Sequence, residues 1–340
     1  MTSLTQTVDP ADRADARPAG PRPTRSAKAA RQRRKWFEII GLTAPAFIVF
    51  SMFVLLPIGF AAYYSLFRWN GVGWPDDFRG LYYYFGEFGA LRDPIFQSSL
   101  RNTGIIIVGS LLVQGPVAIA IALLLNRKFR GRAVFRMLVF VPYVIAEVTV
   151  GVVFSQMLQY DGPANVVLQS LGLGPIDWLG NPGLAIWTIL IVLTWKYTGF
   201  ALILFLAGLS NVPDELAEAA AIDGASWWQI QRHITLPLLG PTIRIWVFLS
   251  MIGAIQVFDV VWVVSTRAIR DLGAGSTIAT YMVDNGYTSH LWGLGNAVAV
   301  IMFVISFVVA LLTQRFLLRR DIDGALTQKA GALTQKAEVR

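Results

Sequence analysis

A patterned stretch of sequence separates two long apolar runs and reads NVPDELAEAAAIDGASWWQIQRHITLPL from Asn211 to Leu238. It is too long and too patterned for a simple connector. Pro213 suits a first helical position, and Asp214 and Glu215 favour the positive start of a helix. Strong helix formers follow, and Gly224 is a typical helix end. The first half of this stretch therefore predicts one short helix.

The second half of the stretch predicts another short helix at an angle to the first. Ser226 and Gln229 have the spacing of a capping box, and Pro237 marks the turn into the next apolar run. Alanines on the first helix let another protein approach its backbone closely, and Glu218 offers a charge to a basic partner residue. A linker helix lying on the membrane surface is the alternative, but such linkers normally carry Lys or Arg rather than four carboxylates.

The sequence outside this stretch is that of a protein embedded in lipid. Of 340 residues, 55% are hydrophobic and only 15% charged. Long apolar runs of roughly 20 residues predict membrane-spanning helices, because lipid offers no hydrogen-bond partner to backbone groups. We therefore expect an all-α integral membrane protein with six transmembrane helices. The predicted spans are 40–64, 103–125, 138–158, 185–209, 239–265 and 297–318, with kinks at Pro45, Pro57, Pro116 and Pro142.

Basic residues predict the orientation of these spans, because short loops rich in Lys and Arg stay in the cytoplasm. The loop at 159–184 has no Lys or Arg, and the loop after the fifth span has only Arg267 and Arg270, so both are predicted outside. Both termini are then cytoplasmic, with a disordered basic tail at 1–36 and a second tail at 319–340. The basic residues predicted inside are Arg127, Lys128, Arg130, Arg132, Arg136, Arg315, Arg319 and Arg320.

A known family signature lies within the patterned stretch. The stretch matches the EAA signature of permease subunits of binding-protein-dependent ABC importers. The matching pattern is Glu218-Ala219-Ala220, three residues, Gly224, nine residues, Ile234, one residue and Leu236-Pro237. The surrounding segments resemble the carbohydrate-uptake branch of this family, such as the larger maltose-system and the glycerol-3-phosphate-system permeases. These segments are 206–209, 212–213 and 222–225. The resemblance covers a type-1 transmembrane domain of five helices at 97–314, after a first helix at 37–66.

This resemblance implies a type I ABC importer permease of the cell membrane, with a cytoplasmic coupling helix at about 213–232. The implied partners are a second homologous permease, two ATPase subunits and an extracytoplasmic sugar-binding protein. The chain contains no Walker A pattern, so ATP and Mg are expected on the partner ATPase, and no cofactor and no enzymatic activity are expected here. The predicted ATPase-coupling residues are Glu218, Ala219, Ala220, Asp223, Gly224, Ile234, Leu236 and Pro237.

The expected function is import of a sugar or oligosaccharide. A polyol or glycerol-phosphate-like solute is an alternative, and so is a self-sufficient secondary transporter, although the chain shows no internal repeat. An intramembrane hydrolase lacks support, because no His-Glu-x-x-His or Gly-x-Ser-x-Gly run is present. The chain has no cysteine, and His233 and His290 are too few and too far apart in sequence for a metal site, so each is expected on the surface.

Polar residues inside the predicted spans are candidates for the substrate path. The fourth span mixes polar and aromatic residues as sugar binding requires, and the resemblance places further contacts on one face of the fifth. Interhelical bonding, such as a Lys196–Asp259 pair, is the alternative, and small residues there also suit helix packing. Residues 265–270 depart from the family's usual Thr-x-Gly-Gly-Pro, so a different outer loop is expected. The predicted path residues are Thr194, Lys196, Tyr197, Gly199, Phe200, Ser250, Gly253, Ala254, Gln256, Val257 and Asp259, and Glu147 is a further intramembrane charge.

Overall fold

The computed structural model describes residues 39–127 and 129–318 and separates the chain into two units, 1–58 and 59–340. The predicted tails at 1–36 and 319–340 therefore lie outside the described residues. An apolar helix, Ile39–Tyr64, begins in the first unit, and the apolar side chains along it are unburied. It contains the π-helical η2 (Ser51–Leu55) and ends with α2 (Leu56–Tyr64). Its length suits a bilayer crossing, in agreement with the predicted first span.

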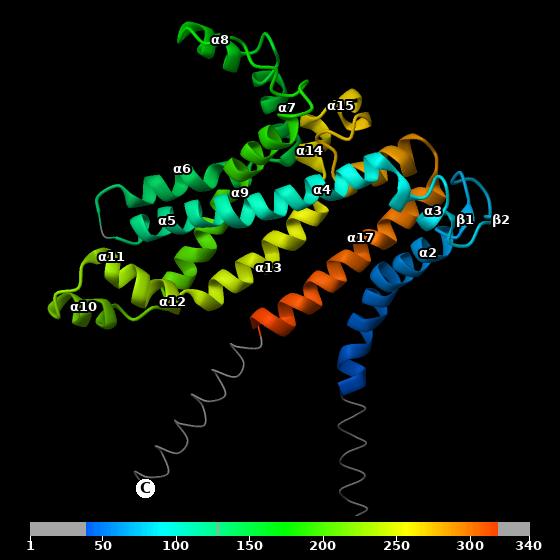
Figure 1. Ribbon diagram of the computed structural model, residues 1–340. Helices are drawn as coiled ribbons and strands as arrows, with labels where there is room; N and C mark the ends of the chain where they lie inside the picture. The colour runs from blue at the N-terminus through cyan, green and yellow to red at the C-terminus, as the bar shows by residue number, and fades with distance from the viewer. Residues whose placement is uncertain (1–38, 128, 319–340) are drawn as a thin grey trace, which may run out of the picture. The chain divides into compact units, whose positions relative to one another are not determined.

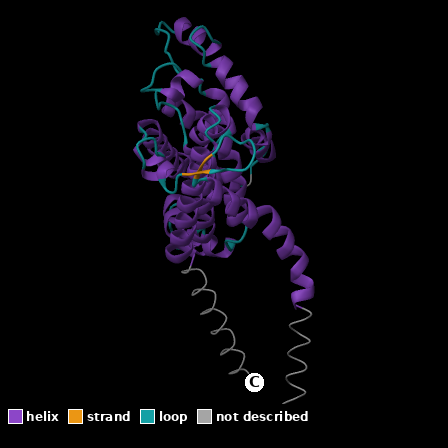
Figure 2. Cartoon of the chain, turned by 90° about the vertical axis from the view of Figure 1, so that its right-hand side faces the viewer, coloured by secondary structure: helices purple, strands orange, loops and turns teal. Residues whose placement is uncertain are grey.

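Nearly all regular structure of the second unit is helical (Figures 1 and 2). Its long elements are α4 (Pro94–Gly109), η4 (Ser110–Gln114), α5 (Gly115–Asn126), α6 (Arg132–Val144), α7 (Glu147–Met157), α9 (Ala185–Leu209), α13 (Gly240–Gln256) and α17 (Trp292–Thr313), which runs on into η7 (Gln314–Leu318). The second span thus begins at Pro94 and the sixth at Trp292, both earlier than predicted. Asp93 starts the second span early because its side chain accepts a hydrogen bond from Ile95 N at 2.7 Å.

Short elements connect these helices. Two antiparallel strands, β1 (Phe67–Arg68) and β2 (Asp77–Phe78), pair Phe67 with Phe78. The other short elements are α3 (Tyr82–Phe85), η3 (Ala90–Arg92), α8 (Pro163–Ser170), α10 (Asp214–Ile222), α11 (Trp227–Ile230), η5 (Gln231–Thr235), α12 (Leu236–Leu238), α14 (Asp259–Val264), α15 (Arg267–Asp271), α16 (Ile278–Val283) and η6 (Asp284–Thr288).

The number of membrane spans is four to six, counted over the described residues. Four helices are long and apolar enough to cross a membrane, and six spans result if each of two bent helix pairs counts as one. The predicted third span is not one helix, because α6 and α7 meet at 93°. The predicted fifth span is also divided, since α13 ends at Gln256 and α14 begins at Asp259.

Each of these two breaks frees a backbone carbonyl whose partner comes from elsewhere in the fold. At the first break, Ile145 O accepts a hydrogen bond from Lys196 Nζ at 2.7 Å. At the second, Val257 O accepts one from Thr277 Oγ1 at 3.1 Å. Non-helical backbone within a membrane protein is tolerated where such partners satisfy it. Continuous helices were the wrong prediction here because these donors lie far away in the sequence.

Prolines in the helices are accommodated by wider turns. The π-helical segments η2, η4 and η5 end two residues before Pro57, Pro116 and Pro237. A proline ring clashes with the carbonyl four residues earlier, and a π turn gives that carbonyl more room. The sequence predicts kinks at Pro57 and Pro116, and the structure shows a π-helical segment before each of them. Pro142 instead lies inside α6, shortly before the break at Ile145.

Helix α9 forms the centre of the second unit. Its first half packs with α7, α13 and α14 in one apolar cluster that includes Ile189, Val192 and Val260. Its second half packs with α5 and α13 in another that includes Phe205 and Trp246. A third cluster joins α3, α4, α16 and α17. Because α9 is shared by the first two clusters, it is the element against which the surrounding helices are positioned (Figure 1).

Candidate functional site

The elbow, residues 211–238, has the local structure that its sequence predicts, with one correction. Helix α10 begins at Asp214, and Pro213 precedes it as the N-cap residue rather than occupying the first helical position. The ψ angle of Pro213 is 126°, which is extended rather than helical. Gly224 follows the helix with a φ of +84°, a conformation that L residues rarely adopt. Gly224 thus ends α10 and turns the chain, as predicted.

The second helix of the elbow has the predicted capping box. Ser226 N donates to Gln229 Oε1 at 2.7 Å, and Gln229 N donates to the Ser226 hydroxyl at 3.4 Å. The segment Trp227–Leu238 then meets α13 at a bend of 65°. His233 is exposed in this segment, and His290 is exposed at a loop. Both histidines therefore lie at the surface, as expected from sequence.

The predicted coupling residues lie along the elbow, and those on α10 are accessible. Every residue of α10 is exposed or half-buried, including Glu218, Ala219 and Ala220. A hollow of about 420 Å³ lies where the turn after α10 meets the second arm of the elbow, and Ile230 forms part of its wall. Its lining includes the predicted residues Asp223, Gly224 and Ile234, while Leu236 and Pro237 lie beyond it in α12.

The α10 carboxylates are available to another molecule. Asp214, Glu215 and Glu218 are all exposed, and none forms a salt bridge with a basic side chain in the described ranges 39–127 and 129–318. A helix with three accessible carboxylates and accessible alanines can accept charge-assisted hydrogen bonds from a protein that approaches closely. The elbow therefore has the surface of a docking element rather than that of a helix packed into its own fold.

A cavity of about 280 Å³ lies between the η4 segment, α6, α9 and α13. Its polar part is a short chain of hydrogen bonds. Ser110 Oγ donates to Gln114 Oε1 at 2.8 Å, and the hydroxyls of Ser110 and Ser250 are 2.7 Å apart. Because a hydroxyl has one proton to donate, Ser250 is the donor to Ser110. The cavity is lined by Ile106, Ser110, Gln114, Tyr143, Leu190, Leu193, Tyr197, Phe200, Trp246, Leu249, Ser250, Gly253, Ala254 and Val257.

Aromatic rings form another part of the cavity wall. The rings of Tyr143 and Phe200 are 5.3 Å apart, and those of Tyr143 and Tyr197 are 6.3 Å apart. Tyr197 Oη donates to Glu147 Oε1 at 2.5 Å, so Glu147 fixes the ring of Tyr197 at the wall. The cavity thus combines hydroxyl and amide groups with ring faces.

Six of the predicted path residues line this cavity: Tyr197, Phe200, Ser250, Gly253, Ala254 and Val257. Lys196 does not. The structure corrects its pairing with Asp259, because Lys196 is 1% exposed and its Nζ donates to Ile145 O instead. The break between α6 and α7 leaves this carbonyl without its helical donor, and a buried ammonium needs such a partner. Lys196 therefore has a structural contact, which it makes at the break in the third span.

The other predicted path residues also lie outside the cavity lining. A Cβ on Gly199 would lie 2.6 Å from Val139 O, so this glycine permits the close approach of α9 to α6. The Thr194 carbonyl accepts a hydrogen bond from Thr198. Gln256 and Asp259 are both exposed on either side of the break after α13.

Sequence reasoning missed Ser110, Gln114, Tyr143 and Trp246. Ser110 and Gln114 are polar residues four positions apart in an otherwise apolar span, so they share one helical face. The rule that marks intramembrane polar residues would have found both. Tyr143 and Trp246 carry no comparable signal, because an aromatic residue in an apolar span is more often a packing residue.

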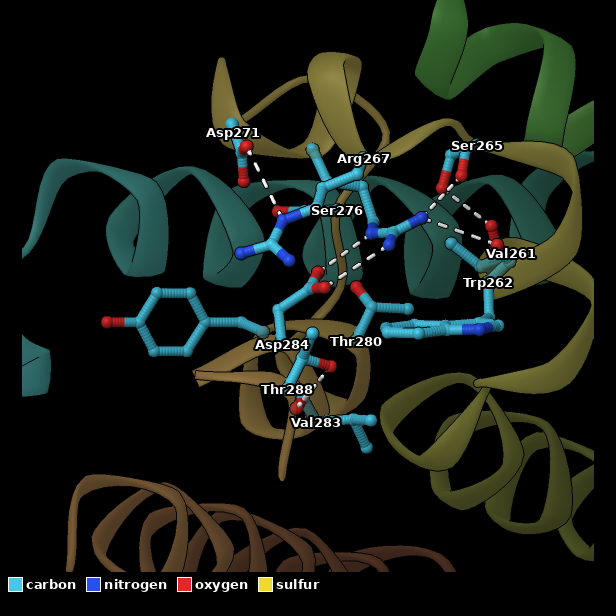
Figure 3. Close-up of polar contacts among 12 residues, drawn as sticks. Val261, Trp262, Ser265, Arg267, Asp271, Ser276, Thr280, Val283, Asp284 and Thr288 are labelled. Atoms are coloured by element: carbon cyan, nitrogen blue, oxygen red, sulfur yellow. Dashed lines mark hydrogen bonds and ion pairs between the residues drawn. The ribbon is translucent and has the colours of Figure 1, made fainter. Parts of the chain in front are cut away.

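The segment between α14 and α17, predicted as an outer loop, contains a buried ion pair. Arg270 donates to both carboxylate oxygens of Asp284, at 2.8 and 3.2 Å, and also to Ser265 O. The guanidinium carbon lies 4.2 Å from the centre of the Trp262 ring. Figure 3 shows Asp284, Ser265 and Trp262 converging on this point. The pair joins α15 to η6 and gives the loop a fixed shape.

Comparison with known proteins agrees with this geometry. The family of binding-protein-dependent transport system inner membrane components matches residues 114–321. The trehalose/maltose transport system permease protein MalF of Thermococcus litoralis is 33% identical over 281 residues, which cover 82% of this chain and 92% of that protein. The lactose transport system permease protein LacF of Rhizobium radiobacter is 32% identical over 290 residues, covering 82% of this chain and 93% of that protein.

A solved structure shares the fold. It is the crystal structure of a bacterial ABC transporter involved in the import of the acidic polysaccharide alginate, with a TM-score of 0.73 at 23% identity, covering 86% of this chain and 99% of that chain. The predicted all-α type I permease fold is thereby confirmed. Since the family match spans more than half of the chain and relatives above 30% identity cover most of it, the chain belongs to the binding-protein-dependent transport system inner membrane components.

Proposed function

We propose that this chain is one of two permease subunits of an ATP-driven importer that carries a sugar or oligosaccharide across the cell membrane. Its relatives support a carbohydrate substrate, because their names specify trehalose/maltose, lactose, arabinooligosaccharides and diacetylchitobiose. The presence of different sugars among relatives of similar identity supports the substrate class rather than one particular sugar.

The cavity between η4, α9 and α13 is the observation that carries this proposal. Ser110, Gln114 and Ser250 supply the hydroxyl and amide groups that sugar hydroxyls require. Tyr143 and Phe200 supply ring faces for the C–H surfaces of a pyranose. No Lys, Arg, Asp or Glu is among the lining residues, all of which belong to the described part of the chain, and this favours a neutral sugar over a phosphorylated solute.

The energy for transport comes from outside this chain. The accessible carboxylates and alanines of α10 form the surface that docks on an ATPase, with Glu218, Gly224 and Ile234 among the coupling residues. Two such ATPases bind ATP and Mg, a second permease completes the pathway, and an extracytoplasmic binding protein delivers the sugar. The elbow then lies in the cytoplasm, together with both termini, as the distribution of basic residues predicts.

Uptake by cells that express the full set of subunits tests this function. In Gln114→Leu, the hydrogen-bond chain loses its amide, so sugar uptake should fall at least about ten-fold, because an unpaired substrate hydroxyl costs roughly a factor of ten or more. Ser155→Ala is the matched control, because Ser155 is not among the cavity residues and its Oγ bonds to Val152 O. Its uptake should match that of the wild type.

The same assay separates the competing functions. A binding-protein-dependent importer requires ATP and its binding protein, whereas a secondary transporter responds to collapse of the ion gradient at constant ATP. Uptake that persists without the ATPase would refute the proposal. Preference for glycerol phosphate or a polyol over every sugar tested would refute the substrate class and leave the importer assignment intact.

A further inference from the structure

A groove of about 520 Å³ lies between α6 and α9, apart from the sugar cavity. One basic residue, Arg136, lines it together with apolar side chains. Met137 is 61% exposed and Ile203 is 45% exposed, so the groove wall is open to the surroundings. The lining residues are Arg136, Met137, Phe140, Leu202, Ile203, Leu206 and Ala207.

Arg136 brings a positive charge to the groove. Its Nη2 donates to Leu125 O at 3.0 Å, which fixes the guanidinium beside the end of α5. Its Nε is buried and has no partner, and it is the one such side-chain nitrogen or oxygen in the part of the chain that the structure describes. Because Nε is buried, a ligand meets the part of the Arg136 side chain that lines the groove, and the positive charge of the guanidinium favours an anionic group there.

The local charge favours an anion as well. Arg127, Arg130 and Arg132 precede Arg136, and no Asp or Glu occurs in the sequence from Arg127 to Ala146. Arg127 and Arg130 are exposed, and Arg132 is half-buried. A basic cluster at the end of membrane helices attracts anionic lipid headgroups, and each cation near the surface adds to the attraction.

We propose that this groove binds an anionic phospholipid, whose phosphate pairs with the guanidinium of Arg136 and whose acyl chain lies along Met137, Ile203 and Leu206. The apolar wall distinguishes a lipid from a soluble phosphate ion, because an ion would leave these side chains uncovered. The proposal is independent of which solute the transporter carries.

Native mass spectrometry of the full-length chain, extracted with its partner subunits in a mild detergent, tests this site. Phosphatidylglycerol, phosphatidylcholine with the same acyl chains, and soluble glycerol phosphate are added in separate titrations. The wild type should retain phosphatidylglycerol at least about ten-fold more tightly than either of the others. Arg136→Gln should lose that preference, whereas Arg130→Gln, which removes an equal charge from the exposed loop, should change it less than two-fold.

A second variant tests the apolar half of the site without removing charge. Ile203→Trp fills the groove and leaves Arg136 in place, so it should also weaken phosphatidylglycerol binding about ten-fold. If Arg136→Gln fails to assemble, this variant still decides the question. The proposal is overturned if both arginine variants lose lipid equally, if glycerol phosphate binds as tightly as the lipid, or if Ile203→Trp binds like the wild type because a neighbouring subunit already fills the groove.

Discussion

Replacing Gly224 with alanine should disrupt coupling through backbone strain alone. Gly224 has a φ of +84°, and a Cβ built on it meets no atom within 4 Å. Alanine therefore fits the available space within this chain, and its only cost is the left-handed conformation. That cost is roughly 1–2 kcal/mol for an L residue other than Asn or Asp.

This strain acts on the one turn that holds α10 against α11. If docking on the ATPase requires the observed turn, a cost of about 1–2 kcal/mol lowers the ratio of docking-competent to other conformations by roughly 5–30-fold. Asparagine adopts left-handed conformations more readily than alanine, although its side chain is larger. The expected order of affinity for the ATPase is therefore glycine, then asparagine, then alanine.

The affinity of purified ATPase for detergent-solubilised permease, measured by pull-down over a concentration series, gives this order directly. A steric cause would give the opposite order for the two variants, because asparagine would collide with the ATPase more than alanine. That reversed order would refute the conformational explanation. Equal affinity for all three proteins would show that the ATPase does not recognise this turn, and sugar uptake by the same variants should follow the measured affinities.

Two further predictions concern packing and buried charge. Gly199→Ala should force α6 and α9 apart and lower the free energy of unfolding by about 1–3 kcal/mol. Gly253→Ala is the control, because no atom lies near its Cβ, and it should have the melting temperature of the wild type. Equal melting temperatures for the two variants would contradict the close approach of α6 and α9 at Gly199. Asp284→Asn leaves the Arg270 charge buried and uncompensated, so the stability of the protein should fall by about 3–5 kcal/mol. Asp271→Asn, in the exposed pair with Arg267, should cost less than about 1 kcal/mol. Thermal unfolding in detergent measures both, and a similar loss in the two aspartate variants would show that the buried pair has no special role.

The elbow could be predicted almost residue by residue because its signals are local. Gly224, Ser226 and Gln229 act on neighbours within a few positions, so their spacing alone specifies the helix end and the capping box. The one error, at Pro213, is a shift of a single position. Such shifts at helix ends are the usual limit of reading boundaries from sequence.

The breaks in the third and fifth spans could not be predicted, because their cause is tertiary. Nothing near Ile145 or Val257 in sequence supplies the donors that satisfy their carbonyls; Lys196 and Thr277 do so from other helices. For the same reason Lys196 resembled a substrate ligand when only its span was known. The cavity face of the fifth span was predicted better, because the family resemblance pointed to Ser250, Gly253 and Val257 and helical periodicity places them on one face.

The path from the elbow to the cavity is short along the chain. The elbow begins just after α9 and ends just before α13. These two helices supply nine of the fourteen cavity residues: Leu190, Leu193, Tyr197, Phe200, Trp246, Leu249, Ser250, Gly253 and Ala254. If an ATPase docks on α10 and displaces α10 and α11, we therefore expect at least one wall of the cavity to move. Both helices pack in the first two apolar clusters, but α9 is continuous, whereas α13 has a 65° bend before it and a break after it. Because packed helices move as rigid bodies and bends absorb the change in angle, α13 is the wall that we expect to move, carrying Ser250 away from Ser110 and opening the hydrogen-bond chain to the sugar.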